Sequence, residues 1–211
     1  MGRLVMAFES ILIYGAVGIG AYLSGSLPSA WLVMRLRDGT DIRTRGSGNV
    51  GALNTYRSSH SPLSALIVLF LDVLKGWLPP ALLMYYGFAD NLMFLFAGIG
   101  VILGHCYPVW LRFHGGRGLA VSAGFFGAVA PLVILVWGLV WLLYFILIRK
   151  HIVANLVATF LLPLIVYFTG DKFFAPHILL LTLAMMFIVF LKHLERLPDV
   201  IFGNPYEKKE S

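Results

Sequence analysis

Long apolar runs constrain this chain more than any other feature of its sequence. A helix needs roughly 20 apolar residues to cross about 30 Å of hydrocarbon. Hydrophobic residues make up 59% of the chain and charged residues only 12%, whereas an average soluble domain is about half apolar and about a quarter charged. A soluble fold would leave much of this apolar surface exposed to water. The sequence therefore predicts an all-α, polytopic integral membrane protein with a single domain over residues 1–211.

The apolar runs predict seven transmembrane helices. The run 119–148 is too long for one span, because a helix rises about 1.5 Å per residue. We expect it to form two passes that meet near Pro131, since proline breaks helices. The predicted spans cover residues 11–34, 62–86, 92–111, 119–130, 132–148, 152–168 and 177–191.

The positions of the cations predict the orientation, because Lys and Arg collect on the cytoplasmic side of a membrane protein. With the N-terminus outside and the C-terminus in the cytoplasm, thirteen of the sixteen Lys and Arg residues lie on the cytoplasmic side. Lys75 instead lies within a span, three residues after Asp72. Charges at that depth usually face the bundle interior and pair. We expect a buried structural pair, or two groups that help to shape a site.

Three polar segments on the predicted cytoplasmic face suit a phosphate. Glycine permits backbone shapes in which successive N–H groups converge on an anion, and arginine adds a planar charged fork. The candidate phosphate ligands are Gly46, Ser47, Gly48, Asn49, Gly51, Asn54 and Arg57 in the first segment, Gly115, Gly116 and Arg117 in the second, and Lys192 in the third. His193 adds an imidazole that can exchange protons near neutral pH. Taken singly, each segment is equally typical of a basic loop facing lipid headgroups.

Other ligands have less support. Cys106 and His105 form a cluster too small to predict a metal site, and no other group of Cys, Asp or Glu suggests one. The aromatic residues lie within the apolar runs, away from the basic ones, which argues against nucleic acid as a partner. The chemistry that fits is the handling of a phosphorylated substrate at the membrane surface, without a metal or cofactor. A small anion channel or carrier is the alternative from another class, although no internal repeat supports it.

At these segments the sequence resembles the bacterial acyl-phosphate:glycerol-3-phosphate acyltransferases, often called the PlsY family. The resemblance covers nearly the whole chain. The matching motifs are SGSLP at 24–28, DIR at 41–43, GSGNVGA at 46–52 with Asn54 and Arg57, LDVLKG at 71–76, GHCYP at 104–108, GGRG at 115–118 and Lys192-His193.

The resemblance implies transfer of a fatty acyl group from acyl phosphate to the sn-1 hydroxyl of glycerol 3-phosphate, which yields lysophosphatidate and phosphate. It places the active site at the cytoplasmic face of the bacterial inner membrane. The implied partners are these two substrates, membrane lipid and an enzyme that forms acyl phosphate. By the same likeness, residues 47–54 cradle a phosphate and Arg57 and Arg117 grip phosphate groups. His193 helps to position or activate the acceptor, so the implied catalytic residues are His193, Ser47 and Arg57.

The chain departs from the family pattern at four positions. The family has Lys where Arg117 stands, Thr at the positions of Leu53 and Val121, and Asn at the position of Arg196. Arginine is not a neutral replacement for lysine, and the missing hydroxyls and amide bear on recognition of the glycerol part. A divergent paralogue that uses another acceptor, or an inactive one, is therefore a second interpretation.

Overall fold

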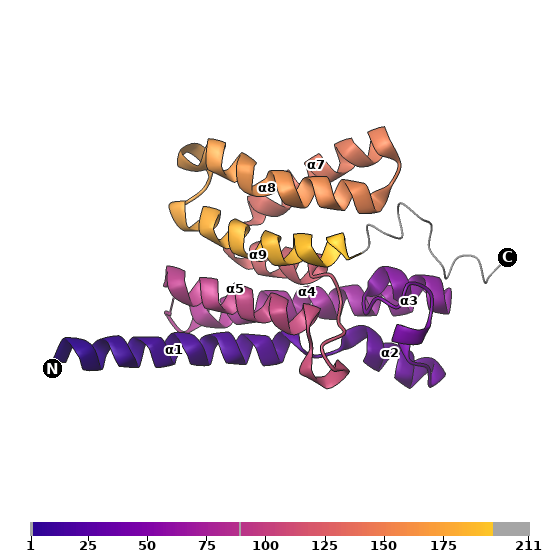
Figure 1. Cartoon of the computed structure of the whole chain (residues 1–211), viewed down its shortest axis with the longest axis horizontal. Helices are drawn as coiled ribbons and strands as arrows, with labels where there is room; N and C mark the ends of the chain where they lie inside the picture. The colour runs from indigo at the N-terminus through magenta and orange to yellow at the C-terminus, as the bar shows by residue number, and fades with distance from the viewer. Residues whose placement is uncertain (1, 89, 196–211) are drawn as a thin grey trace.

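The chain forms a bundle of long helices capped at one end by short ones. The computed structural model describes residues 2–88 and 90–195, and the regular elements within them are all helical. Figure 1 shows the long helices in layers, from α1 through α4 and α5 to α9 and then α7 and α8. The α-helices are α1 (Gly2–Gly25), α2 (Ser29–Asp38), α3 (Ala52–Ser59), α4 (Pro62–Tyr85), α5 (Asn91–Cys106), α6 (Leu119–Val129), α7 (Pro131–Ile148), α8 (His151–Phe173) and α9 (Pro176–Leu194). Two 3-10 turns, η1 (Ile42–Thr44) and η2 (Val109–Leu111), lie in the polar connections.

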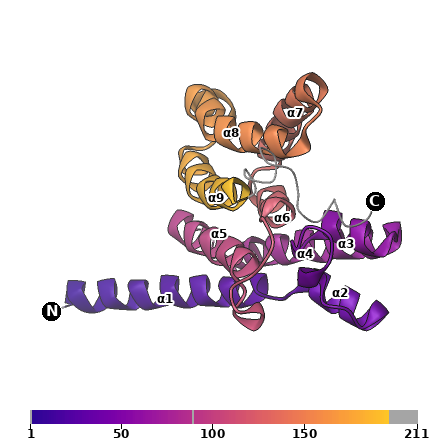
Figure 2. The ribbon, with the colours of Figure 1, turned by 45° about the vertical axis from the view of Figure 1, so that its right-hand side comes forward.

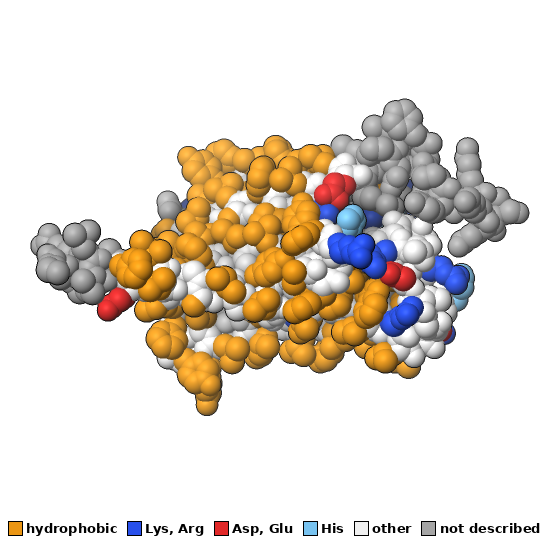
Figure 3. Space-filling model, turned by 60° about the horizontal axis from the view of Figure 1, so that its bottom comes forward, with side chains coloured by type: hydrophobic (Ala, Val, Ile, Leu, Met, Phe, Trp, Pro, Cys, Tyr) orange, Lys and Arg blue, Asp and Glu red, His pale blue; other side chains and the backbone are white. Residues whose placement is uncertain are grey.

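The helices have the length and surface of membrane spans. Figure 3 shows apolar side chains over most of one face of the molecule, with Lys and Arg gathered toward one end. By length and composition, six helical segments in the described ranges could cross a membrane: Phe8–Asp38, Pro62–Tyr85, Asn91–Leu111, Pro131–Ile148, His151–Gly170 and Pro176–Leu194. The chain is a multi-pass integral membrane protein, as the sequence predicts.

The first predicted span, 11–34, is not one continuous helix. Helix α1 ends at Gly25 and α2 begins at Ser29, because Pro28 has no N–H to donate and disfavours helical backbone at the residue before it. The break leaves the Leu27 carbonyl without a helical partner. The Lys75 ammonium donates to this carbonyl at 2.9 Å and lies 2.9 Å from Asp72 Oδ1. The buried pair therefore holds the break between α1 and α2.

The long apolar run 119–148 is divided at the expected place. Helix α6 ends at Val129 and α7 begins at Pro131, and Figure 2 shows the two helices diverging from this point. The link between α7 and α8 lies at the same end of the bundle as α2 and α3, whereas the α8–α9 turn lies at the opposite end (Figure 1). With 11 residues, α6 is about 16 Å long, shorter than the hydrocarbon thickness.

Small residues let pairs of helices approach closely. A Cβ at Gly100 of α5 would collide with the Gly18 backbone of α1, and one at Gly124 of α6 would collide with the Val73 carbonyl of α4. Close approach through glycine is the usual way for helices to pack inside a membrane. The α4–α6 contact fixes where α6 begins, and therefore where the preceding polar segment meets the other two.

Candidate active site

A cleft of about 530 Å³ lies at the basic end of the bundle, where three polar segments meet. Four cationic side chains and two carboxylates line it, so its charge favours an anion. The lining residues are Asp41, Arg43, Thr44, Ser47, Gly48, Asn49, Arg112, Phe113, His114, Gly115, Arg117, Lys192 and Glu195. Of the predicted phosphate ligands, Ser47, Gly48, Asn49, Gly115, Arg117 and Lys192 are thus brought together. No group of three or more His, Cys, Asp or Glu side chains in the described ranges could hold a metal ion.

Asn54 shapes the first wall of the cleft from behind. It lies in the first turn of α3 with 2% of its surface exposed. Its Oδ1 accepts the Ser47 N–H at 2.8 Å, and its Nδ2 donates to the carbonyls of Arg45 at 3.1 Å and Asn49 at 2.9 Å. Its side-chain amide is therefore fully used in holding the loop, and Asn54 does not line the cleft.

Two glycines of the first segment are required by this turn. Gly46 and Gly48 have φ of +51° and +69°, a region that other residues rarely adopt. A Cβ at Gly46 would also collide with Asn54 Oδ1. The Gly48 N–H donates to the Arg45 carbonyl at 2.9 Å. Gly46 and Gly51, which precedes α3, do not line the cleft.

The second segment folds back on the end of α5. The Gly115 N–H donates to the Cys106 carbonyl at 3.2 Å, and the Gly116 N–H donates to the His105 carbonyl at 3.0 Å. These two amides are therefore occupied by backbone carbonyls. Gly115 still lines the cleft, whereas Gly116 is buried, and a Cβ there would lie 2.8 Å from the carbonyl of Val50 in the first segment. The two segments are thus in contact.

Arg43, which the sequence does not single out as a site residue, pairs with Asp41 within the first segment and reaches the second segment through a hydrogen bond. Its Nη2 lies 2.6 Å from Asp41 Oδ2, and its Nη1 donates to the Leu111 carbonyl of η2 at 3.2 Å. Hydrogen bonding to Arg43 lowers the pKa of Asp41 from 3.8 to about 2, and Asp41 in turn raises the pKa of Arg43. The pair is therefore charged at neutral pH. In the sequence, the DIR motif at 41–43 is the signal that could have predicted this ion pair.

Besides Asn54, Gly46 and Gly51, three predicted site residues lie outside the lining of the cleft. Gly116 is buried behind it, and Arg57 is exposed on α3 without a hydrogen bond or ion pair to the described residues. His193 is fully buried on α9: its Nδ1 lies 2.8 Å from the Val189 carbonyl, and its Nε2 lies 3.4 Å from Asn155 Nδ2. Since a carbonyl only accepts, Nδ1 carries the proton and Nε2 accepts from Asn155.

The four departures from the family pattern lie in different surroundings. Arg117 lines the cleft. Leu53 is half exposed on α3, and Val121 is fully buried in the contact between α6 and α4. A hydroxyl at residue 121 would therefore not face this cleft. Arg196 lies outside the described residues.

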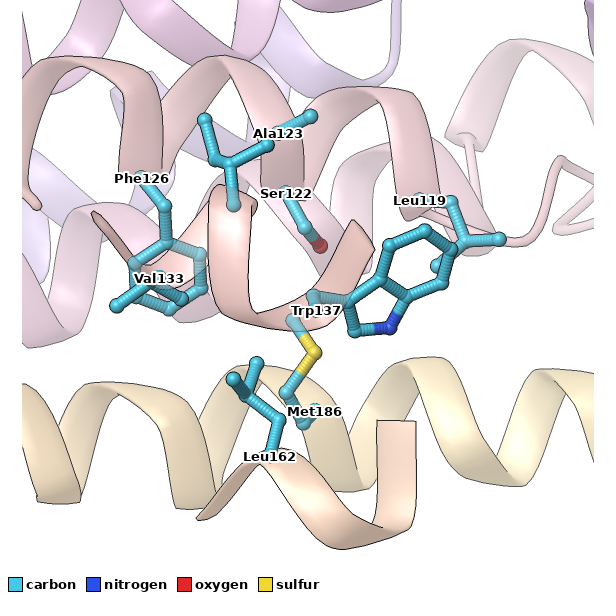
Figure 4. A pocket seen from close by; sticks show the side chains of 9 residues that line it. Leu119, Ser122, Ala123, Phe126, Val133, Trp137, Leu162 and Met186 are labelled. Carbon is cyan, nitrogen blue, oxygen red and sulfur yellow. The ribbon is translucent and has the colours of Figure 1, made fainter. Parts of the chain in front are cut away.

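An apolar pocket of about 110 Å³ lies between α6, α7, α8 and α9. Leu119, its first lining residue, is two positions after Arg117 of the cleft. Figure 4 shows the side chains that line it, and the red atom is the hydroxyl oxygen of Ser122. Ser122 Oγ is buried and has no hydrogen-bond partner among residues 2–88 and 90–195. The remaining lining residues are Ala123, Phe126, Val133, Ile134, Trp137, Leu162 and Met186.

Comparison with known proteins identifies the family. The model of the glycerol-3-phosphate acyltransferase family matches residues 15–203. The chain belongs to this family. Among curated glycerol-3-phosphate acyltransferases, that of Mesorhizobium japonicum is 38% identical over 183 residues, covering 87% of this chain and 90% of the relative. That of Shewanella woodyi is 36% identical over 190 residues, covering 88% and 89%.

Solved structures of the glycerol-3-phosphate acyltransferase PlsY have the same fold. The crystal structure of its glycerol 3-phosphate form superposes with a TM-score of 0.77 at 33% identity and covers 90% of this chain and 93% of PlsY. The lysophosphatidic acid form superposes with a TM-score of 0.74 at 31% identity over the same shares of both chains. PlsY is described as an integral membrane protein, in agreement with the apolar surface of this family member.

Proposed function

We propose that this glycerol-3-phosphate acyltransferase family member transfers a fatty acyl group from acyl phosphate to the sn-1 hydroxyl of glycerol 3-phosphate. The observation that carries the proposal is the position of a cationic cleft next to an apolar pocket, only two residues apart along the chain. Such a pair of sites suits a substrate with a charged headgroup and a hydrocarbon tail. Membership of the family and the forms in which PlsY was solved support the same reaction.

The residues that line the cleft are the proposed phosphate ligands. Arg117 and Lys192 supply positive charge, and Ser47 and Asn49 supply neutral hydrogen-bonding groups. We assign Gly46, Gly48, Gly51, Asn54, Gly115 and Gly116 to the shape of the walls. Arg57 does not line the cleft, and we propose that its exposed guanidinium binds the phosphate of the substrate from the edge of the cleft.

The reaction needs no covalent enzyme nucleophile, because acyl phosphate is a mixed anhydride with a good leaving group. The acceptor hydroxyl oxygen bonds to the acyl carbon, the bond from that carbon to the phosphate oxygen breaks, and the hydroxyl proton passes to the departing phosphate. Positioning and cationic stabilisation supply the catalysis. The buried ring of His193 does not accept this proton in the proposal. It positions the end of α9, and thereby Lys192.

The apolar pocket is the proposed site of the acyl chain near its reacting end. The pocket and the lipid tails are both apolar, so close packing, rather than removal from water, would hold the first carbons of the donor in the pocket. Bulky side chains, Phe126 and Trp137 among them, line the pocket. The donor arrives from the membrane in this scheme, and the acceptor arrives from water.

The proposed location is the bacterial inner membrane, with the N-terminus outside and the cleft facing the cytoplasm. The grouping of the cations at one end of the bundle supports this orientation. Residues 1–211 then act as one acyltransferase domain, without a cofactor or metal. An enzyme that forms acyl phosphate is the proposed functional partner.

An acyl-transfer assay tests the proposal. Purified protein in detergent is given glycerol 3-phosphate with either palmitoyl phosphate or palmitoyl-CoA, and lysophosphatidate is measured. We expect product with the phosphate donor and little with the thioester. Absence of product with both donors, from protein that still binds inorganic phosphate, would favour a paralogue with another acceptor.

A further inference from the structure

Glu195 is a carboxylate that lines a cleft suited to anions. It caps the C-terminal end of α9, and its side chain is 53% exposed. A negative charge at a helix C-terminus is electrostatically unfavourable, because the helix dipole is negative there. Its position therefore does not stabilise α9 by itself, and another contact must account for it.

That contact is with Lys192, three residues earlier. Lys192 Nζ lies 2.8 Å from Glu195 Oε2 and 3.1 Å from Oε1, so both carboxylate oxygens bind the ammonium. The ammonium also lies 4.5 Å from the centroid of the Tyr107 ring. Lys192 is 8% exposed, so its charge is held inside the wall of the cleft and needs a nearby anion.

A phosphate would bind the same ammonium in the same way. Two oxygens of a phosphate can replace the two carboxylate oxygens, with a larger charge. Glu195 can rotate into water at little cost once a phosphate takes its place, because its side chain is already 53% exposed and the ammonium keeps an anionic partner. Lys192, by contrast, cannot leave the wall without exposing the buried part of its stem.

We infer that Glu195 is a resident counter-anion of the phosphate site, which neutralises Lys192 in the empty cleft and competes with the phosphate of the substrate. The inference rests on the proposed function for the identity of that substrate. It makes Glu195 a residue that sets the affinity of the site: it weakens, by the same factor, the binding of every ligand that places a phosphate on Lys192.

Substitution of Glu195 by glutamine tests the inference directly. Glu195→Gln keeps the size of the side chain and removes its charge. We expect the KM for glycerol 3-phosphate to fall about twofold to fivefold, the change expected when a competing exposed ion pair is lost, with kcat unchanged. Asp38→Asn is the matched control, because Asp38 pairs with Arg37 at the same end of the bundle and does not line the cleft. An unchanged or higher KM in Glu195→Gln would overturn the inference.

A binding measurement separates this inference from the proposed function. Titration calorimetry with inorganic phosphate needs no turnover, so it applies even if the purified protein forms no lysophosphatidate. We expect Glu195→Gln to bind phosphate more tightly than the wild type, and Glu195→Asp to bind it about as the wild type does. In a Lys192→Met background, Glu195→Gln should have no effect. If Glu195→Gln raised the phosphate affinity equally in the Lys192→Met background, the carboxylate would act through its charge on the whole cleft and not by competing for Lys192. That result would overturn the inference. A lower Tm for Glu195→Gln with unchanged phosphate affinity would assign Glu195 a merely structural role.

Discussion

Single side chains at the cleft divide into those that shape its walls and those that face its interior. Asn54 belongs to the first kind, since its amide is hydrogen-bonded to the loop on both its oxygen and its nitrogen. Lys192 and Arg117 belong to the second. Composition alone predicts that all three bind phosphate, because Asn, Lys and Arg are each common ligands. Only the direction of each side chain, which the fold sets, distinguishes the two roles.

Asn54→Ala should destabilise the first segment. The change removes the hydrogen bonds of Asn54 to the Ser47 N–H and to the Arg45 and Asn49 carbonyls, and each lost hydrogen bond costs about 0.5–1.5 kcal/mol. We expect a lower Tm in detergent and a loss of most acyl transfer. Asn91→Ala, at an exposed position at the start of α5, serves as the control and should leave both unchanged. Wild-type activity in Asn54→Ala would mean that the loop does not depend on this side chain.

Arg57→Ala tests the predicted ligand that lies outside the lining of the cleft. The guanidinium is exposed and has no partner among the described residues, so its removal should cost no stability. Loss of a charged hydrogen bond of about 1.5–3 kcal/mol to the substrate would lower kcat/KM by roughly 10- to 150-fold. The exposed Lys150 supplies the control variant Lys150→Ala. If Arg57→Ala kept full kcat/KM, its assignment as a phosphate ligand would be withdrawn.

At the scale of elements, the ends of helices are held by charged side chains. Lys75 of α4 donates to the Leu27 carbonyl where α1 gives way to α2, beside the Ser29 N–H, and it also neutralises Asp72. Non-helical backbone at membrane depth is tolerated only where such partners exist. The sequence analysis predicts this buried pair, but not its role, because the break at Pro28 lies within an apolar run that otherwise reads as one helix.

Lys75→Met should be strongly destabilising. Removing one partner of a buried ion pair costs about 3–5 kcal/mol, because the other charge remains buried and unpaired. We expect a large fall in Tm, partly restored in Asp72→Asn/Lys75→Met, where no charge is left. Lys172→Met, at an exposed position late in α8, should have little effect. A double variant no more stable than the single one would argue against the pairing.

The Asp41–Arg43 pair, whose arginine contacts the second polar segment, should respond to acid. The pKa of Asp41 is lowered from 3.8 to about 2 by Arg43, so its contribution to stability is present above pH 3.8 and is lost as the pH falls toward 2. We expect Asp41→Asn to have a lower Tm than the wild type at neutral pH, with a difference that shrinks between about pH 4 and pH 2. A difference that stays constant with pH would mean that the charge of Asp41 does not contribute.

At the scale of the whole molecule, hydropathy predicts the class of fold and most helix positions. The break near Pro131 and the bounds of α4 follow from apolar runs and prolines that can be read directly, whereas α5 ends at Cys106 rather than at the predicted residue 111. The sequence places residues 41–49 and 112–117 on one face and predicts that they share a phosphate, but which of their side chains line the cleft depends on how closely α4 and α6 pack. The sequence does not single out Glu195, because Lys and Glu three residues apart are common on helix surfaces.

Cysteine labelling can determine the orientation of the bundle. The native Cys106 is fully buried and should not react with a membrane-impermeant maleimide in intact membranes. We expect Arg45→Cys and Lys150→Cys to be labelled from the cytoplasmic side, and Lys172→Cys from the opposite side. Labelling of the first two from different sides would contradict the arrangement of the helices. Labelling of both from outside would reverse the proposed orientation.

The hydrogen bonds of Asn54 have a consequence for inhibitors. They fix the backbone of residues 45–49 during folding, so little conformational entropy remains to be lost when a ligand arrives. Rigid binding sites bind small, rigid molecules with a low entropy cost. A compact phosphonate without an acyl tail should therefore keep much of the affinity that the cleft has for the phosphate group of the substrate. The cleft is thus a starting point for the design of water-soluble inhibitors.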